Sequence, residues 1–297
     1  MLRGIFGVVG LVLLASSALA RPPQLLQPSG AWVPLKSEHS CKLSRAFGEG
    51  KNRVVAILER PGPGYDIKMM VFGPGLRSGP AGWNAQSSFL PNTAHVFKDG
   101  LSARTARGDT AIQWTAVDFA PDRALSTPIR TVKDFADFMG ARRDDESSAA
   151  AAVTGISVSE PGGNRLVLQS GAMDEVHRKL DECGREMLRG WGLDPVAHNR
   201  IVIRAVSKRN PKELIDSRDY PVLAARYGGE AIITARLMVD AAGAVTNCTA
   251  ISDFAEPEME QLICRNLSKA VFQPAMTVDG ETAPDYALMT FRFGIGP

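Results

Sequence analysis

The fold is decided by residues 219–293, which read DYPVLAARYGGEAIITARLMVDAAGAVTNCTAISDFAEPEMEQLICRNLSKAVFQPAMTVDGETAPDYALMTFRF. The segment opens with Tyr220-Pro221 and runs through mostly apolar residues to Gly228-Gly229. Proline suits the first turn of a helix and glycine its C-terminal end, so this opening predicts a short helix. Residues 230–239 and 244–251 then show a period of two, which predicts two strands joined in a hairpin.

A second helix is predicted after the hairpin, over residues 256–271. It starts with Glu256-Pro257-Glu258, where acidic residues suit the positive end of the helix dipole and proline suits the first turn. Its apolar residues fall on one face, and Pro274 cannot continue it. Residues 286–293 form a last strand. The order helix, hairpin, helix, strand predicts a three-stranded antiparallel sheet with helices on one face.

These motifs, in this order and spacing, resemble the C-terminal domain of TonB-type energy transducers, over residues 212–297. The matching residues are Tyr220, Pro221, Gly228, Asp240, Gly243, Val245, Phe272, Pro274, Ala275, Gly280, Phe291 and Phe293. Two features depart from the family pattern. Ser252-Asp253 stands where the family often has Ser-Gly, and Cys248 and Cys264 take positions where apolar residues would be expected.

The resemblance implies a protein-binding module. The motifs of the sequence single out no catalytic residue, and no cofactor is predicted. Domains of this family bind a short extended segment of an outer-membrane receptor by adding it to a sheet edge, where main-chain hydrogen bonds supply the affinity. The implied partner is thus a protein or peptide, such as a TonB-dependent outer-membrane receptor engaged in transmembrane transport. By this analogy the binding edge is the last strand, formed by Tyr286, Ala287, Leu288, Met289, Thr290, Phe291, Arg292 and Phe293.

The period of two divides this last strand into two faces. Phe291 and Phe293 are predicted to pack on the preceding helix. Tyr286, Leu288 and Thr290 share the other parity, which predicts a mixed polar face turned outward.

Two other functions stay open. The chain would be a membrane-anchored energy transducer if residues 1–20 remained attached, although the long proline-rich spacer of such transducers is missing. It would be an envelope structural protein or an enzyme if the N-terminal region carried its own activity.

Residues 1–20 have the pattern of a secretory signal peptide. Arg3 precedes an apolar run from Ile5 to Leu14, and Ala18-Leu19-Ala20 fits a small-x-small cleavage site. The alternative is an uncleaved anchor, for which the apolar run is slightly short. We therefore expect a periplasmic protein whose mature chain begins at Arg21.

Composition narrows the class of protein. The 297 residues are 44% hydrophobic and 22% charged, which is typical of a globular protein and argues against disorder. The formal net charge is +2, so nothing favours binding to nucleic acid.

The four cysteines predict two disulfide bonds in an exported chain. Cys248 lies on the second strand of the hairpin and Cys264 on the inward face of the helix after it, so the two can come within bridging distance. Cys41 is then left to pair with Cys183, on the core-facing side of another predicted helix. A zinc site would need closely spaced cysteine or histidine ligands, and no such spacing is present.

The region before the TonB-like part predicts an antiparallel β structure, because its short apolar runs are separated by glycine and proline turns. A short helix is predicted from Thr131, and the charged residues 142–148 predict its end. The whole chain is thus predicted to be α+β. Its predicted divisions are a signal peptide (1–20), an extended lead-in (21–36), a β-rich domain with a helix at 171–190 (37–206), a linker (207–218) and a TonB C-terminal-like domain (219–297).

Few residues outside the TonB-like part point to chemistry. His177 and Asp181 are four residues apart on a helix and could share a metal ion, but the apolar face of that helix lies elsewhere, which favours a solvated pair. His39 could activate Cys41, but an exported cysteine is expected to be oxidised. We therefore predict no metal site and no enzymatic activity.

Overall fold

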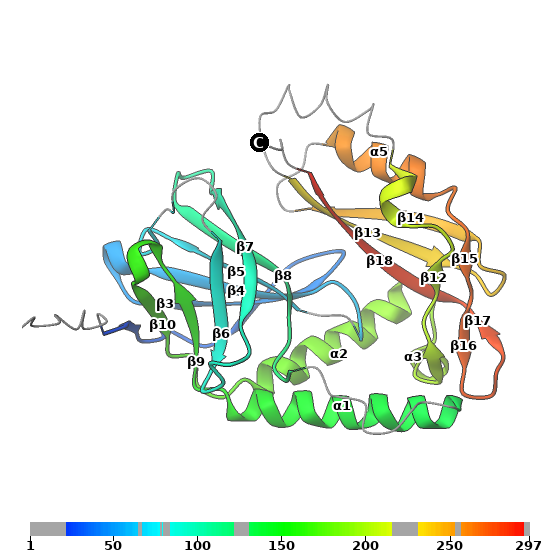
Figure 1. Cartoon of the computed structure of the whole chain (residues 1–297), viewed down its shortest axis with the longest axis horizontal. Coiled ribbons are helices and arrows are strands. Elements are labelled where there is room, and N and C mark those ends of the chain that lie inside the picture. Colours follow the sequence, from blue (N-terminus) through cyan, green and yellow to red (C-terminus); the bar gives the residue numbers. More distant parts are fainter. Residues whose placement is uncertain are drawn as a thin grey trace, which may run out of the picture.

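The computed structural model describes residues 22–64, 67–77, 79, 84–121, 131–215, 231–252 and 257–293. This part of the chain is α+β and rich in strands, as predicted (Figure 1). Its buried apolar side chains form two separate clusters, one from residues 26–180 and one from residues 205–291. The predicted signal peptide and the predicted helix from Tyr220-Pro221 to Gly228 lie outside the described residues. No helix in the described ranges is long and apolar enough to span a membrane.

A curled ten-stranded sheet surrounds the first cluster. Its strands are β1 (Gln24–Leu26), β2 (Val33–Leu35), β3 (Cys41–Phe47), β4 (Val54–Arg60), β5 (Ile67–Gly73), β6 (Ala85–Leu90), β7 (Phe97–Arg104), β8 (Thr110–Val117), β9 (Gly155–Ser159) and β10 (Arg165–Leu168). They lie in the order β1-β10-β9-β6-β7-β8-β5-β4-β3-β2. Phe47, Leu58 and Trp114 are almost fully buried in this core.

The first two strands form opposite edges of this sheet. β1 runs parallel to β10, and β2 runs antiparallel to β3. Between them, Pro28 bridges Phe47, and the Ser29 N–H donates to the Ala46 carbonyl at 2.9 Å. The predicted lead-in is extended, but it is an integral part of the sheet and links the two edges of the curl.

Helix α1 (Val132–Ala152) is longer than the short helix predicted at this position. The predicted end at residues 142–148 is wrong, because Arg142, Arg143 and Glu146 are good helix formers and no glycine or proline interrupts that stretch. Thr131 and Asp134 form a capping box at its start, in which each side chain bonds the backbone of the other.

Helix α2 (Asp174–Gly190) matches the predicted amphipathic helix and packs beside α1 (Figure 1). Val176, Leu180 and Leu188 are buried along one face. This face also contacts β3 and β4. We call the ten-stranded sheet with α1 and α2 the first unit.

The second cluster lies between a three-stranded sheet and a helix. The antiparallel strands β13 (Ala231–Val239), β14 (Val245–Ser252) and β18 (Asp285–Phe293) follow the order β14-β13-β18. Helix α5 (Pro257–Leu267) packs on one face, through Met259, Ile263 and Leu267. Ile233, Ala235 and Leu237 lie in the second core, as the predicted alternation of β13 requires, and Thr234 and Arg236 between them are buried on the other face. We call this sheet with α5 the second unit.

Helix α5 ends four residues before the predicted end at residue 271. Two tight turns close it, in which the Lys269 N–H donates to the Asn266 carbonyl and the Ala270 N–H to the Leu267 carbonyl. Val271 is consequently extended and exposed, and it bridges Ala244 at the end of the hairpin.

Short elements surround the second unit. They are α3 (Pro195–His198), β11 (Ile201–Ile203), β12 (Val206–Ser207), β15 (Phe272–Gln273), β16 (Ala275–Thr277) and β17 (Thr282–Ala283), with 3₁₀ turns at Gly50–Asn52, Pro161–Gly163 and Pro211–Leu214. β11 pairs with β16, and β12 pairs with β15. Residues 201–207 therefore pair with β15 and β16, two strands that follow α5 along the chain.

Candidate functional site

The TonB-like motif residues of the hairpin turn meet those after α5. The Asp240 carboxylate accepts from the N–H groups of Ala242 and Ala244 at 2.9 and 2.8 Å, which fixes the turn. Gly243 has a φ of +88° and lies so close to the Phe272 carbonyl that a Cβ would collide with it. The Phe272 N–H donates back to the Gly243 carbonyl at 2.9 Å. The sequence spacing of these motifs thus serves a direct backbone contact.

The remaining described motif residues are structural as well. Phe272 and Ala275 are fully buried in the second core. Pro274 lies against the same turn, 3.5 Å from where a Cβ of Gly243 would be. Gly280 has a φ of +81° in a turn where its N–H donates to the Thr277 carbonyl. Tyr220, Pro221 and Gly228 lie outside the described residues.

Strand β18, the predicted peptide-binding strand, lies at one end of the three-stranded sheet. Ala287, Met289 and Phe291 are buried in the second core. Leu288 is half-buried and Thr290 is exposed, while the side chains of Arg292 and Phe293 lie outside the described part. β14 forms the opposite end of the sheet.

The prediction that Tyr286 faces outward is wrong, because its side chain is fully buried. Its hydroxyl donates to the Pro63 carbonyl of the first unit, and its ring lies 4.9 Å from the Trp191 ring, between centroids. The first unit therefore covers the beginning of β18 on the face that was predicted to be polar and outward. A sequence pattern shows which side chains share a face, but not what packs on it.

Asp285 organises this junction. Its carboxylate is fully buried and lies 2.9 Å from His198 Nε2, and it accepts from Arg204 Nε at 2.8 Å and from the Ala205 N–H at 2.9 Å. Burial alone would raise the pKa of Asp285, but the bonds from His198, Arg204 and Ala205 outweigh burial and lower that pKa to about 2. Asp285 therefore stays ionised at neutral pH and holds α3 and the segment after it against β18.

Arg236 lies near the centre of β13, on the same face of the sheet as Tyr286. Its guanidinium lies over the Trp191 ring at 4.1 Å from the centroid, and Nη2 donates to Thr249 Oγ1 at 3.3 Å. Within the described residues its Nε and Nη1 atoms are buried without a hydrogen-bond partner. Burial lowers the pKa of this guanidinium.

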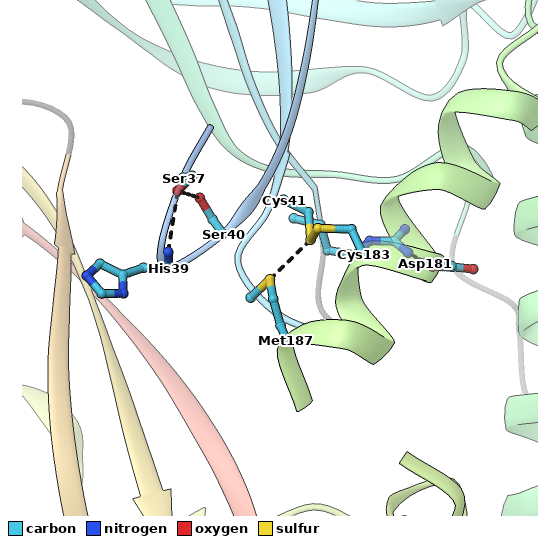
Figure 2. The surroundings of a disulfide bond; sticks show 8 residues. Ser37, His39, Ser40, Cys41, Asp181, Cys183 and Met187 are labelled. Carbon is cyan, nitrogen blue, oxygen red and sulfur yellow. Dashed lines mark hydrogen bonds and ion pairs between the residues drawn. A yellow bond between two sulfur atoms is a disulfide. The ribbon is translucent and has the colours of Figure 1, made fainter. Parts of the chain in front are cut away.

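Both predicted disulfide bonds are confirmed. Cys41–Cys183 joins β3 to α2 with a Cα–Cα distance of 5.9 Å, and Cys248–Cys264 joins β14 to α5 at 5.4 Å. Figure 2 shows the Met187 sulfur beside the first bridge, 3.1 Å from Cys41 Sγ. In the same view the His39 ring is directed away from the bridge.

A cavity of about 240 Å³ opens where the first sheet meets α1 and α2. The first sheet and its loops contribute Arg60, Gly64, Ile67, Val117 and Asp118. Helix α1 contributes Met139, Arg142, Arg143 and Glu146, and α2 contributes His177 and Asp181. This cluster could hardly be predicted from the sequence, because its residues come from four separate segments. One available signal was Arg142 and Glu146, which are one helical turn apart within α1.

The carboxylates of this cavity have partners. Asp181 is paired with Arg60, and Asp118 lies 2.6 Å from His95 Nε2 and 3.5 Å from Arg142 Nη2. Glu146 accepts from the backbone N–H groups that follow β8, those of Phe119 and Ala120, and burial raises its pKa.

The sequence predicts that His177 and Asp181 are both solvated, and for His177 this prediction is wrong. Its side chain is 12% exposed and lies edge-on to Phe119, with centroids 5.8 Å apart. Burial, and then the charge of Arg60, lower the pKa of His177 to about 4, so it is neutral at neutral pH. Within the described ranges, no group of three or more His, Cys, Asp and Glu residues could hold a metal ion.

Comparison with known proteins leaves this geometry as the basis for assigning a function. No protein-family model matches the chain, and no curated protein is significantly similar to it.

Proposed function

We propose that this protein is a periplasmic protein-binding module that takes up an extended peptide by strand addition at β18, in connection with TonB-dependent transport. The observation that carries the proposal is the sheet β14-β13-β18, which has α5 on one face and ends in β18. This is the arrangement that the resemblance to TonB C-terminal domains implies. A strand at the end of a sheet can template another chain through its main chain.

The proposal predicts weak and transient binding. An added segment of five residues would form about four or five backbone hydrogen bonds, each contributing roughly 0.5–1.5 kcal/mol net. Part of this gain is lost in ordering the peptide. The first unit buries Asp285 and Tyr286, so the peptide would align with the later part of β18, around the exposed Thr290.

A periplasmic location is part of the proposal. Two disulfide bonds, one in each unit, favour an oxidising compartment. The signal-peptide pattern of residues 1–20 points the same way, and N-terminal sequencing of protein from its native envelope tests it. A chain that still starts at Met1 and needs detergent for extraction would favour the membrane-anchored transducer.

The binding edge is tested with paired proline variants. A displayed library of random heptapeptides is selected on the purified protein, and the best peptide is titrated calorimetrically. Thr290→Pro should weaken its binding by tenfold or more, about 1.4 kcal/mol, because proline removes an amide donor and bends the strand.

The matched control is Asn247→Pro, at an exposed position of the opposite edge strand β14. It should leave binding unchanged, and a thermal melt of each variant shows whether it remains folded. If Asn247→Pro alone weakens binding, or if no peptide is selected, strand addition at β18 is not the function.

A further inference from the structure

The cavity between the first sheet, α1 and α2 has a polar wall with a defined charge pattern. Three arginines line it, Arg60, Arg142 and Arg143, together with the three carboxylates of Asp118, Glu146 and Asp181. His177 adds a neutral imidazole. The formal charges of the wall cancel, so the ligand class depends on which of these groups are already used inside the protein.

The carboxylates are used. Asp181 is paired with Arg60, Asp118 lies between His95 and Arg142, and Glu146 accepts from two backbone N–H groups. A cationic ligand would therefore have to displace a protein donor at each of these carboxylates.

Arg143 differs from the other charged residues of the wall. It is exposed, and no ion pair to it is present within the described part of the chain. Its neighbour on α1, Arg142, is paired with Asp118, which follows β8. The charged hydrogen-bond donor that this cavity offers to a ligand is therefore the Arg143 guanidinium, on α1.

The rest of the wall is apolar. Ile67, Val117 and Met139 come from the start of β5, the end of β8 and α1. A cavity of about 240 Å³ is of the size that suits a small metabolite.

We propose that this cavity binds a small organic anion, with its carboxylate or phosphate group on Arg143 and its carbon skeleton against Ile67, Val117 and Met139. A guanidinium can bind either group through two parallel N–H donors. The site is separate from the β18 edge, so this proposal does not depend on the proposed peptide binding.

Calorimetry on the purified full chain tests the ligand class with four probes. Glutarate and glycerol 3-phosphate represent the two anionic groups, glutaramide is a neutral analogue of glutarate, and putrescine is a dication of similar length. We expect one or both anions to bind at millimolar concentrations, and the tighter of the two identifies the preferred group. Failure of both anions, or tighter binding of glutaramide or putrescine, would overturn the proposal.

Variants of one exposed helix residue locate the site. Arg143→Gln should weaken binding of the preferred anion at least about tenfold, and Arg143→Glu should abolish it. Arg185→Gln, a matched change at an exposed position of α2 outside the cavity, should bind as the unaltered protein does. Equal affinities for Arg143→Gln and Arg185→Gln would place the anion elsewhere and contradict the assignment.

Discussion

Asp285 shows how one carboxylate can hold a junction between elements that are distant in sequence. His198 and Arg204 precede it by 87 and 81 residues, and both bond its oxygens. Such a group is costly to bury unless every acceptor is satisfied. The sequence offered no sign of this role, because Asp285 is a single acid beside a predicted strand.

Acid should weaken the protein through Asp285 over a defined pH range. The folded pKa of about 2 lies below the ordinary value of 3.8, so the unfolded chain takes up the proton first as the pH falls. The stabilisation, about 2 kcal/mol, is complete above about pH 4 and is lost as the pH falls toward 2. Denaturant titrations across this range measure it.

Asp285→Asn is the variant for this measurement. It should cost about 3 kcal/mol at pH 7, because Arg204 loses its charged partner in a buried site. The dependence of stability on pH between 4 and 2 should become shallower. A variant with the same acid dependence as the unaltered protein would show that another group is responsible.

Two glycines of the TonB-like motif allow a matched test of backbone contact against backbone strain. Gly243 and Gly280 both have positive φ, but only at Gly243 would a Cβ meet other atoms. Gly243→Ala should cost about 3 kcal/mol from strain and collision, and Gly280→Ala about 1 kcal/mol from strain alone. Chemical denaturation measures both, and equal losses would mean that the contact with Phe272 is unimportant.

At the scale of elements, local sequence patterns predict those helices and strands that are determined by residues close together in the chain. The hairpin 231–252 and the helix at 174–190 follow from periodicity and turn residues, and the disulfide Cys248–Cys264 follows from that hairpin and the next helix. The length of α1 could not be predicted in this way. The charged residues 142–148 predict the end of a helix, but the helix continues through them and Arg142 and Glu146 line a cavity. The burial of His177 depends on Phe119, which lies 58 residues earlier.

The bridge between β14 and α5 should stabilise the second unit. Cys248 and Cys264 are 16 residues apart, and a bridge closing a loop of this size contributes about 3 kcal/mol by restricting the unfolded chain. Replacing both cysteines with alanine should lower the free energy of unfolding by that amount. Peptide mapping without reductant should recover the Cys41–Cys183 and Cys248–Cys264 pairs, and a Cys41 peptide linked to Cys248 or Cys264 would contradict this pairing.

At the scale of the whole molecule, the contacts that join the first and second units could not be predicted from the sequence. The first unit contributes Pro63 and Trp191, and the second contributes Tyr286 and Arg236. These contacts connect residues up to 223 apart, so no local period reports them. The strand partners of residues 201–207 lie near the other end of the chain, so no local period reports this pairing either.

The junction itself is testable through Gly62. A Cβ there would lie 2.6 Å from the Tyr286 ring, which is fully buried and cannot swing away. Gly62→Ala should therefore destabilise the protein by about 1–3 kcal/mol through overpacking. Gly190→Ala is the control, because a Cβ at that helical position meets nothing within 4 Å and alanine favours helix. Similar unfolding curves for the two variants would mean that Tyr286 does not hold the units together.

The seam of the curled sheet sets the order in which the chain can finish folding. β1 is made first, yet its partner β10 emerges only 142 residues later, when Leu166 can align with Gln24. Until β10 is available, the segment from β1 to β2 can pair only with β3, through β2 and Pro28. The sheet therefore stays unclosed until β9 and β10 are available, and its closure depends on the far end of the first unit. β1 precedes the other strands of this sheet along the chain, yet it is among the last of them to be fixed in place.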